Sequence, residues 1–150
     1  MANIKHFFTN LSCYLIISFI TSNAVLAEDI DTTKTKSDWD VPAIQLSTAG
    51  FYRVSIKSNL NPLAVNQFHS WVVHVETPEG KLVENANIRI SGGMPAHKHG
   101  FPTSPRITKY SGNGDYLLEG VKFSMPGPWV MNLKVKVAGK SDSVSFDITL

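Results

Sequence analysis

A two-residue alternation of apolar and polar side chains runs through most of the chain and constrains its fold more than any other feature. It is clearest in residues 129–137, where Trp129, Met131, Leu133 and Val135 alternate with mostly polar neighbours. Successive side chains of a β-strand point to opposite faces, so this spacing predicts a strand with one buried face. No window of comparable length has helical spacing, and we therefore expect an all-β protein.

The same alternation recurs at short intervals, separated by turns rich in Gly, Pro and Asn. It predicts strands over residues 50–57, 68–76, 81–84, 87–91, 106–110, 115–123, 129–137 and 144–150. About seven short strands at such intervals favour an antiparallel β-sandwich. Tyr116, two residues after Gly114, enters a late strand in the manner of the tyrosine corner of Greek-key sandwiches, although Gly-x-Tyr is a common triplet.

The N-terminal residues are typical of a secretory signal peptide. An apolar run follows Lys5 and ends in small residues at Ala27, which predicts a signal peptide over residues 1–27. The alternative is an uncleaved membrane anchor, but a spanning helix needs about 20 predominantly apolar residues, and Asn10 and Ser18 interrupt this run. We expect a periplasmic or secreted protein with no stable transmembrane segment after cleavage.

Composition divides the rest of the chain into two parts. Residues 28–48 are rich in Asp, Thr, Lys and Ser and predict a flexible N-terminal tether. Residues 49–150 are then one β domain of ordinary size. The single cysteine, Cys13, lies in the leader, so this domain can form no disulfide and bind no metal through thiolate. The formal net charge is +2 and the cations are scattered, which excludes a nucleic-acid surface.

One loop, Gly92–Pro105, interrupts the strand pattern and contains the residues best suited to bind a metal. Met94, His97 and His99 lie among its glycines and prolines. In an extended segment alternate residues point the same way, so we expect the two imidazoles to converge and Lys98 to turn away. Imidazole suits copper, zinc, nickel and iron, and a thioether narrows the choice towards copper, especially Cu(I).

Two further residues are candidates to complete such a site. Met125 precedes a Pro-Gly-Pro turn that could lie at the same end of the domain as Met94, and His69 enters an early strand. The structural alternatives stay open, because histidines in loops often only hydrogen-bond to backbone or water. His69 shares a strand face with Trp71 and can be a core or rim histidine, whereas His74 falls on the opposite face and is expected to be structural.

Catalysis has no support in the sequence. No hydrolase, phosphate-binding or dinucleotide motif appears. Asp115 and Glu119 share a strand face, but that spacing is common. Zinc hydrolases need a third protein ligand, often a carboxylate, and none lies near His97 and His99 in the sequence. We expect the protein not to be an enzyme.

Several segments together resemble the YtkA-like domain family. The resemblance covers about residues 66–137 and depends on the segments His69-Ser70-Trp71, Glu84-Asn85-Ala86, Gly92–Thr103, Gly114-Asp115-Tyr116 and Phe123–Trp129. It implies an immunoglobulin-like β-sandwich, exported or membrane-tethered, related to the FixH accessory proteins of cytochrome oxidase assembly. It also makes copper handling a reasonable expectation. One departure is Lys98, where the family pattern leads us to expect a small residue and where a cation would disfavour a bound metal.

Three functions follow as hypotheses. The first is an exported accessory protein that binds copper through Met94, His97 and His99, completed by Met125 or His69. The second is a non-catalytic interaction module, in which Phe101 and Pro102 of the Gly92–Pro105 loop dock on a membrane or periplasmic partner. The third is a sandwich that binds a small ligand.

Overall fold

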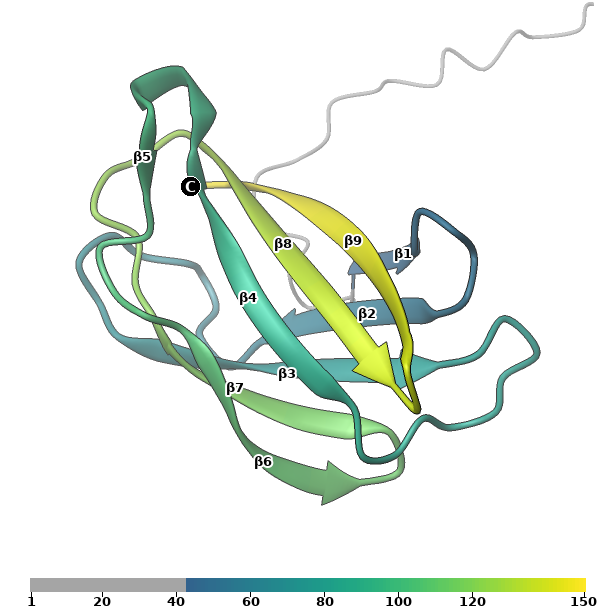
Figure 1. Cartoon of the computed structure of the whole chain (residues 1–150). Coiled ribbons are helices and arrows are strands. Elements are labelled where there is room, and N and C mark those ends of the chain that lie inside the picture. The colour runs from purple at the N-terminus through teal and green to yellow at the C-terminus, as the bar shows by residue number, and fades with distance from the viewer. Residues whose placement is uncertain (1–42) are drawn as a thin grey trace, which may run out of the picture. The chain divides into compact units, whose positions relative to one another are not determined.

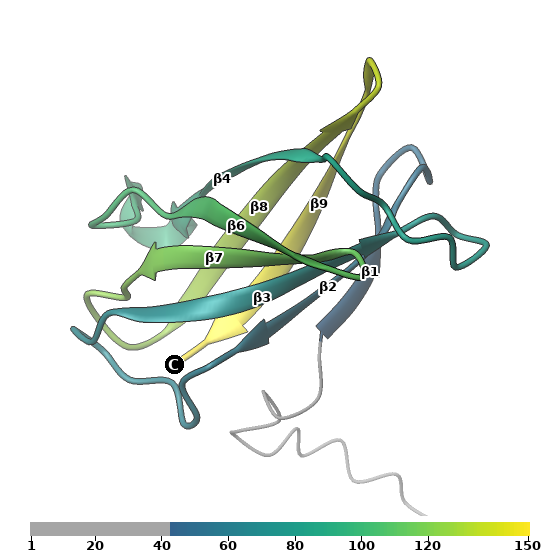
Figure 2. The ribbon, with the colours of Figure 1, turned by 90° about the horizontal axis from the view of Figure 1, so that it is seen from below.

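Two antiparallel sheets packed face to face confirm the predicted all-β sandwich (Figures 1 and 2). The structure is a computed structural model and describes residues 43–150. The predicted signal peptide and residues 28–42 of the predicted tether lie outside the described residues. Within residues 43–150 no helix is long and apolar enough to cross a membrane.

The sheets differ in size. The larger has the order β1-β2-β3-β7-β6, with β1 at Ala43–Leu46, β2 at Arg53–Ser58, β3 at His69–Glu76, β7 at Asp115–Val121 and β6 at Arg106–Gly112. The smaller has the order β5-β4-β8-β9, with β5 at His99–Gly100, β4 at Asn87–Met94, β8 at Pro128–Val137 and β9 at Lys140–Thr149. All ladder pairs between these strands are antiparallel.

The core lies between the sheets and is built from the alternating residues that the sequence singles out. In β8 the side chains of Trp129, Met131 and Leu133 are buried, and in β3 those of Trp71 and Val73 are buried. Met131 is fully buried, which confirms its predicted place in the core. The intervening residues face outward, so the period of two comes from sheets that are apolar on one face only.

The ordered domain begins earlier than expected. Residues 43–46 fall in the predicted tether, yet they form β1, which pairs with β2 from Ala43↔Ile56 to Leu46↔Arg53. The turn after β1 is fixed by Asp142 on β9, which accepts a hydrogen bond of 2.6 Å from the Ser47 hydroxyl. The boundary predicted after residue 48 is therefore too late, because a partner 95 residues away orders a segment that looks like a linker by composition.

The segment between β3 and β4 also differs from expectation. The strand predicted over residues 81–84 is reduced to one isolated bridge, Glu76↔Leu82. The Tyr116 hydroxyl on β7 holds this segment: it donates to the Val83 carbonyl at 2.8 Å and accepts from the Ala86 N–H at 3.0 Å. A tyrosine corner bonds only a few residues upstream, so the resemblance of Tyr116 to that motif is wrong, although its hydroxyl does anchor backbone.

One end of the sandwich brings together segments that are distant in sequence. The β4–β5 hairpin, the connection between β7 and β8, and the C-terminus lie there (Figure 1). Gly127 and Leu150 exchange two backbone hydrogen bonds, of 3.0 and 3.2 Å, which tie the β7–β8 connection to the end of the chain. Most residues predicted for a metal site are at this end.

Candidate metal site at one end of the sandwich

Two glycines let β4 pack closely between its neighbours just before the candidate ligands. A Cβ added at Gly92 would lie 2.0 Å from the Val130 carbonyl oxygen, and one at Gly93 would lie 2.1 Å from the His99 carbonyl oxygen. Real Cβ atoms cannot approach so closely, so any other residue would push the strands apart. The glycines therefore set the separation between β4, β5 and β8 at the point where Met94 and His99 pair.

The chain reverses between these two ligands in a tight turn. Residues Pro95–His97 form a short 3-10 helix, η2, and Lys98 follows with φ 55°. The Lys98 N–H donates to the Pro95 carbonyl at 3.1 Å. The extended path predicted for His97-Lys98-His99 is therefore wrong, because the proline and the left-handed residue close a turn there.

The turn still brings the two imidazoles together. The ring centroids of His97 and His99 are 6.0 Å apart, with their planes inclined at 42°. Two imidazoles that share one metal ion at about 2.0 Å each have centroids roughly 6 Å apart when the ion lies between them. The rings differ in exposure, since His97 is exposed and His99 is half-buried. Lys98 is exposed at the end of the turn, but it lines the same hollow as Met94 and His99 and does not turn away from them as predicted.

His99 presents one nitrogen that makes no hydrogen bond. Its Nδ1 lies 2.9 Å from the Gly100 carbonyl oxygen, which can only accept, so Nδ1 carries the proton. Its Nε2 therefore keeps a free lone pair, and this atom is buried with no hydrogen-bond partner among residues 43–150. Buried polar atoms are seldom left unpaired, because the loss of hydration costs about 1–3 kcal/mol. A metal ion would satisfy this lone pair, and the carbonyl would orient the ring.

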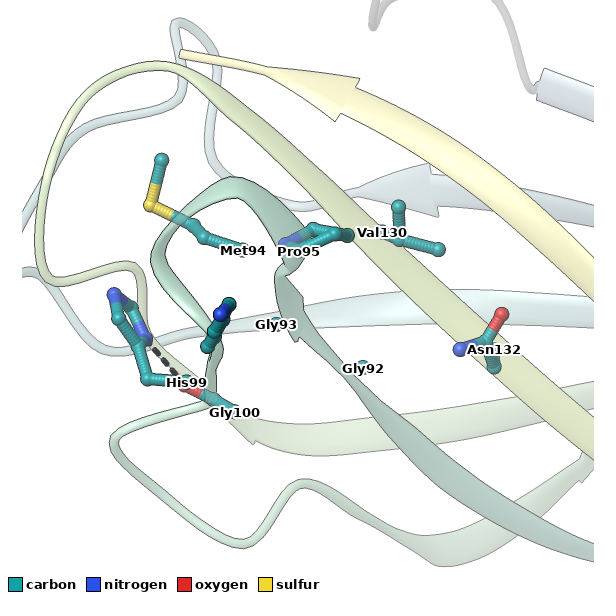
Figure 3. Close-up of a pocket in the computed structure, with 9 residues that line it drawn as sticks. Gly92, Gly93, Met94, Pro95, His99, Gly100, Val130 and Asn132 are labelled. Carbon is teal, nitrogen blue, oxygen red and sulfur yellow. Dashed lines mark hydrogen bonds between the residues drawn. The ribbon is translucent and has the colours of Figure 1, made fainter.

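Met94 lies in the same hollow as His99. The two residues line a shallow cavity of about 320 Å³, together with Gly92, Gly93, Lys98 and Asn132 among others. Figure 3 shows the Met94 thioether and the unbonded ring nitrogen of His99 on the same side of this hollow. Met94 is 1% exposed, and its terminal methyl group lies 3.1 Å from where a Cβ at Gly127 would stand.

A cluster of aromatic rings supports the hollow from inside. The indole of Trp129 stacks on Phe101 with centroids 5.7 Å apart and packs edge-on against Phe123 at 5.2 Å. His99 meets the same indole at 5.6 Å and 69°. Phe101 is half-buried in this cluster, where its ring stacks on Trp129.

Met125 and His69 lie beside the aromatic cluster and do not line the hollow. The Met125 carbonyl accepts a hydrogen bond of 3.1 Å from Trp129 Nε1, and its side chain packs against the core. His69 contacts Phe123 with centroids 5.5 Å apart. Its Nδ1 lies 3.0 Å from the Gln67 carbonyl oxygen, and its buried Nε2 also has no hydrogen-bond partner within residues 43–150. Burial lowers the pKa of His69, against the opposing effect of the Gln67 carbonyl.

His74 has the structural role expected of it. Its Nδ1 lies 2.7 Å from an Asp115 carboxylate oxygen, and its Nε2 lies 3.9 Å from Glu76, which also pairs with Arg53 at 2.6 Å. Within residues 43–150 no group of three or more His, Cys, Asp or Glu side chains is placed to hold a metal ion. A metal at the sandwich end would therefore need the thioether as a ligand.

The contribution of Trp129 could not be read from the sequence beyond its place in the core. The signal that could have indicated it is the segment Met125-Pro126-Gly127-Pro128-Trp129, in which the Met125 carbonyl binds the indole whose ring contacts His99.

Comparison with known proteins gives one match. The YtkA-like family model matches residues 46–134, more than half of the chain. No curated protein and no solved structure gives a significant match.

Proposed function

The chain belongs to the YtkA-like family, and we propose that it is an exported, non-catalytic accessory protein that binds copper at the end of its sandwich. Met94 and His99 are the central ligands, and His97 is within reach of the same ion. Met125 and His69 lie outside the hollow and are assigned to its support. The signal peptide predicted over residues 1–27 would deliver the protein to the periplasm or the exterior.

One observation carries this proposal: His99, with its buried, unpaired Nε2, is the cross-strand partner of buried Met94, and both residues line one hollow. The carbonyl of Gly100 fixes the neutral tautomer in which Nε2 is a metal ligand. His69 also has a buried, unpaired Nε2, but it does not line the hollow. What distinguishes His99 is that it is paired across the β4–β5 ladder with Met94, which supplies a thioether as a second ligand for an ion.

The donor types favour copper. Soft thioether sulfur selects Cu(I), whereas imidazole is shared by several transition metals. Zn²⁺ prefers four imidazole, thiolate or carboxylate ligands, and the described residues offer no cluster of three such side chains. Lys98 opposes a bound cation, because it lines the same hollow as Met94 and His99, although its side chain is exposed to solvent.

The test is a metal titration of the purified protein with Cu(I), Cu(II) and Zn(II). His99→Ala and Met94→Leu should each lower the affinity for Cu(I) by more than the about 10–100-fold that loss of an outer-shell partner costs. His74→Ala and Met131→Leu are matched controls, because His74 is paired with Asp115 and Met131 is in the core. Binding no tighter than roughly micromolar (a free energy of about −8 kcal/mol), or binding unchanged by both site variants, would sink the proposal.

The alternative is the interaction module that docks through the Gly92–Pro105 loop. Among its predicted contacts Pro102 is exposed, but Phe101 is stacked on Trp129. If the titration detects no metal binding, the interaction module becomes the favoured hypothesis, since the rigid loop would then have no metal to hold.

A further inference from the structure

The two histidines of the turn differ in their exposure to solvent, in their strand pairing and in the contacts that fix their rings. His99 is half-buried, pairs with Met94 across the β4–β5 ladder, and has its ring fixed by the Gly100 carbonyl and the Trp129 indole. His97 is exposed, lies in a one-turn helix that has no buried residue, and has His99 as its aromatic neighbour. The cavity that Met94 and His99 line does not include His97.

We infer that these residues have different roles in metal binding. Met94 and His99 hold the metal, and His97 is the ligand that an acceptor displaces. This inference rests on the proposed function. The 6.0 Å between the ring centroids is close to the separation of two imidazoles that share one ion, so His97 is near enough to complete the coordination. Its exposure means that an incoming ligand can approach the ion from the His97 side, while the aromatic cluster covers the other side.

The exchange step follows from this arrangement. A sulfur or nitrogen donor of the acceptor forms a bond to the ion as the bond to His97 breaks, so the ion keeps its coordination number and its oxidation state. His97 then returns to water, which costs little for an exposed ring. The bonds to Met94 and His99 break afterwards, as further ligands of the acceptor replace them. The acceptor is therefore a protein or small molecule with thiolate, thioether or imidazole ligands that can reach the tip of the turn.

Exposed Lys98 adds a charge preference to this approach. It stands next to His97 at the tip, with its backbone fixed at φ 55°. A cation there attracts an acidic acceptor surface, and such steering raises association rates and weakens with salt.

The experiment measures the affinity and the transfer rate separately on the purified protein loaded with Cu(I). Affinity is measured by competition with bathocuproine disulfonate, and transfer by rapid mixing with an excess of the same chelator. His97→Ala should weaken affinity by less than about tenfold and speed transfer by a similar factor, because most affinity changes lie in the dissociation rate. His99→Ala should weaken affinity at least ten times more than His97→Ala does. His74→Ala, another histidine outside the hollow, should change neither quantity.

The outcomes separate this inference from the proposed function. If the unsubstituted protein binds no Cu(I), the proposed function fails first. If it binds, but His97→Ala costs as much affinity as His99→Ala, the two histidines hold the ion equally and the division of roles is wrong. If His97→Ala changes neither affinity nor transfer rate, His97 is not a ligand and the inference is also wrong. Because His97 is exposed, its substitution leaves the fold intact.

Discussion

The imidazole of His99 packs edge-on against the indole of Trp129, with ring centroids 5.6 Å apart and planes at 69°. The contact joins β5, at the edge of the smaller sheet, to the first inward-facing residue of β8. It places a natural fluorophore beside the proposed metal site.

This contact predicts that Cu(I) binding changes the fluorescence of Trp129. An ion on His99 Nε2 alters the field and the contacts at the indole, so emission should change in proportion to occupancy up to saturation. The chain has three tryptophans, and Trp129→Phe should remove most of the response. Trp71→Phe is the control, and an equal loss of response in that variant would contradict the predicted location of the site.

The glycines beneath the site give a prediction about the backbone. Gly93→Ala should destabilise the domain by about 2 kcal/mol or more, because its Cβ would meet the His99 carbonyl at 2.1 Å and the strands must separate. Gly139→Ala is the control, since Gly139 has φ 86° with open space around it and should cost only about 1–2 kcal/mol of backbone strain. Urea unfolding measures both, and equal losses would show that close strand packing at Gly93 contributes nothing.

Tyr116→Phe should lower the free energy of unfolding by about 1–2 kcal/mol, because the Val83 carbonyl and the Ala86 N–H both lose their partner. Tyr110→Phe is the matched control, since Tyr110 is exposed and its one hydrogen bond, from the Gly114 N–H, is 3.3 Å long. Chemical unfolding of the two variants checks the difference. Equal effects would mean that the β3–β4 segment does not depend on the Tyr116 hydroxyl.

Asp142 predicts a loss of stability in acid. Burial raises its pKa, but hydrogen bonds from the Ser47 hydroxyl and from the N–H groups of Ala49, Ser143 and Phe51 outweigh burial and hold its pKa below the usual value. A carboxylate whose pKa is lower in the folded state stabilises the fold fully above its unfolded pKa, about 4. That stabilisation is lost as the pH falls through the folded value.

Asp142→Asn should therefore cost about 1–3 kcal/mol at neutral pH, and the difference from the unsubstituted protein should shrink below about pH 4. Thermal unfolding at several pH values measures this. Asp147→Asn, on the exposed face of the same strand, is the control. A constant difference between Asp142→Asn and the parent from pH 7 to pH 3 would show that the Asp142 charge is not responsible.

The sequence predicted those parts of the fold in which local pattern and tertiary environment agree. Alternation in β8 and β9 reflects a sheet with one buried face. The pattern placed β8 within one residue, whereas β9 begins at Lys140, four residues before the predicted strand. The alternation did not predict β1. There Ile44 and Leu46 are exposed, and the strand depends on the Asp142 contacts across the domain. No local pattern carries that information.

The sequence named the residue types of the candidate site, and the structure corrected how those residues are arranged. The turn from Pro95 to Lys98 needs a residue in the left-handed conformation at its end. Lysine seldom adopts that conformation, so nothing in the sequence indicated the turn. The free nitrogen of His99 depends on the direction of one carbonyl, which sequence does not encode. The separation of His69 from the hollow depends on Phe123 lying beside it, which is a matter of packing across two sheets.

In the proposed function, the buried thioether of Met94 and the half-buried imidazole of His99 bind the same copper ion. X-ray absorption at the copper edge of the Cu(I)-loaded protein tests this most directly. It should show nitrogen and sulfur scatterers in the first shell, with the sulfur lost in Met94→Leu and kept in Met131→Leu. A first shell of nitrogen and oxygen alone, or one that Met94→Leu leaves unchanged, would contradict the claim.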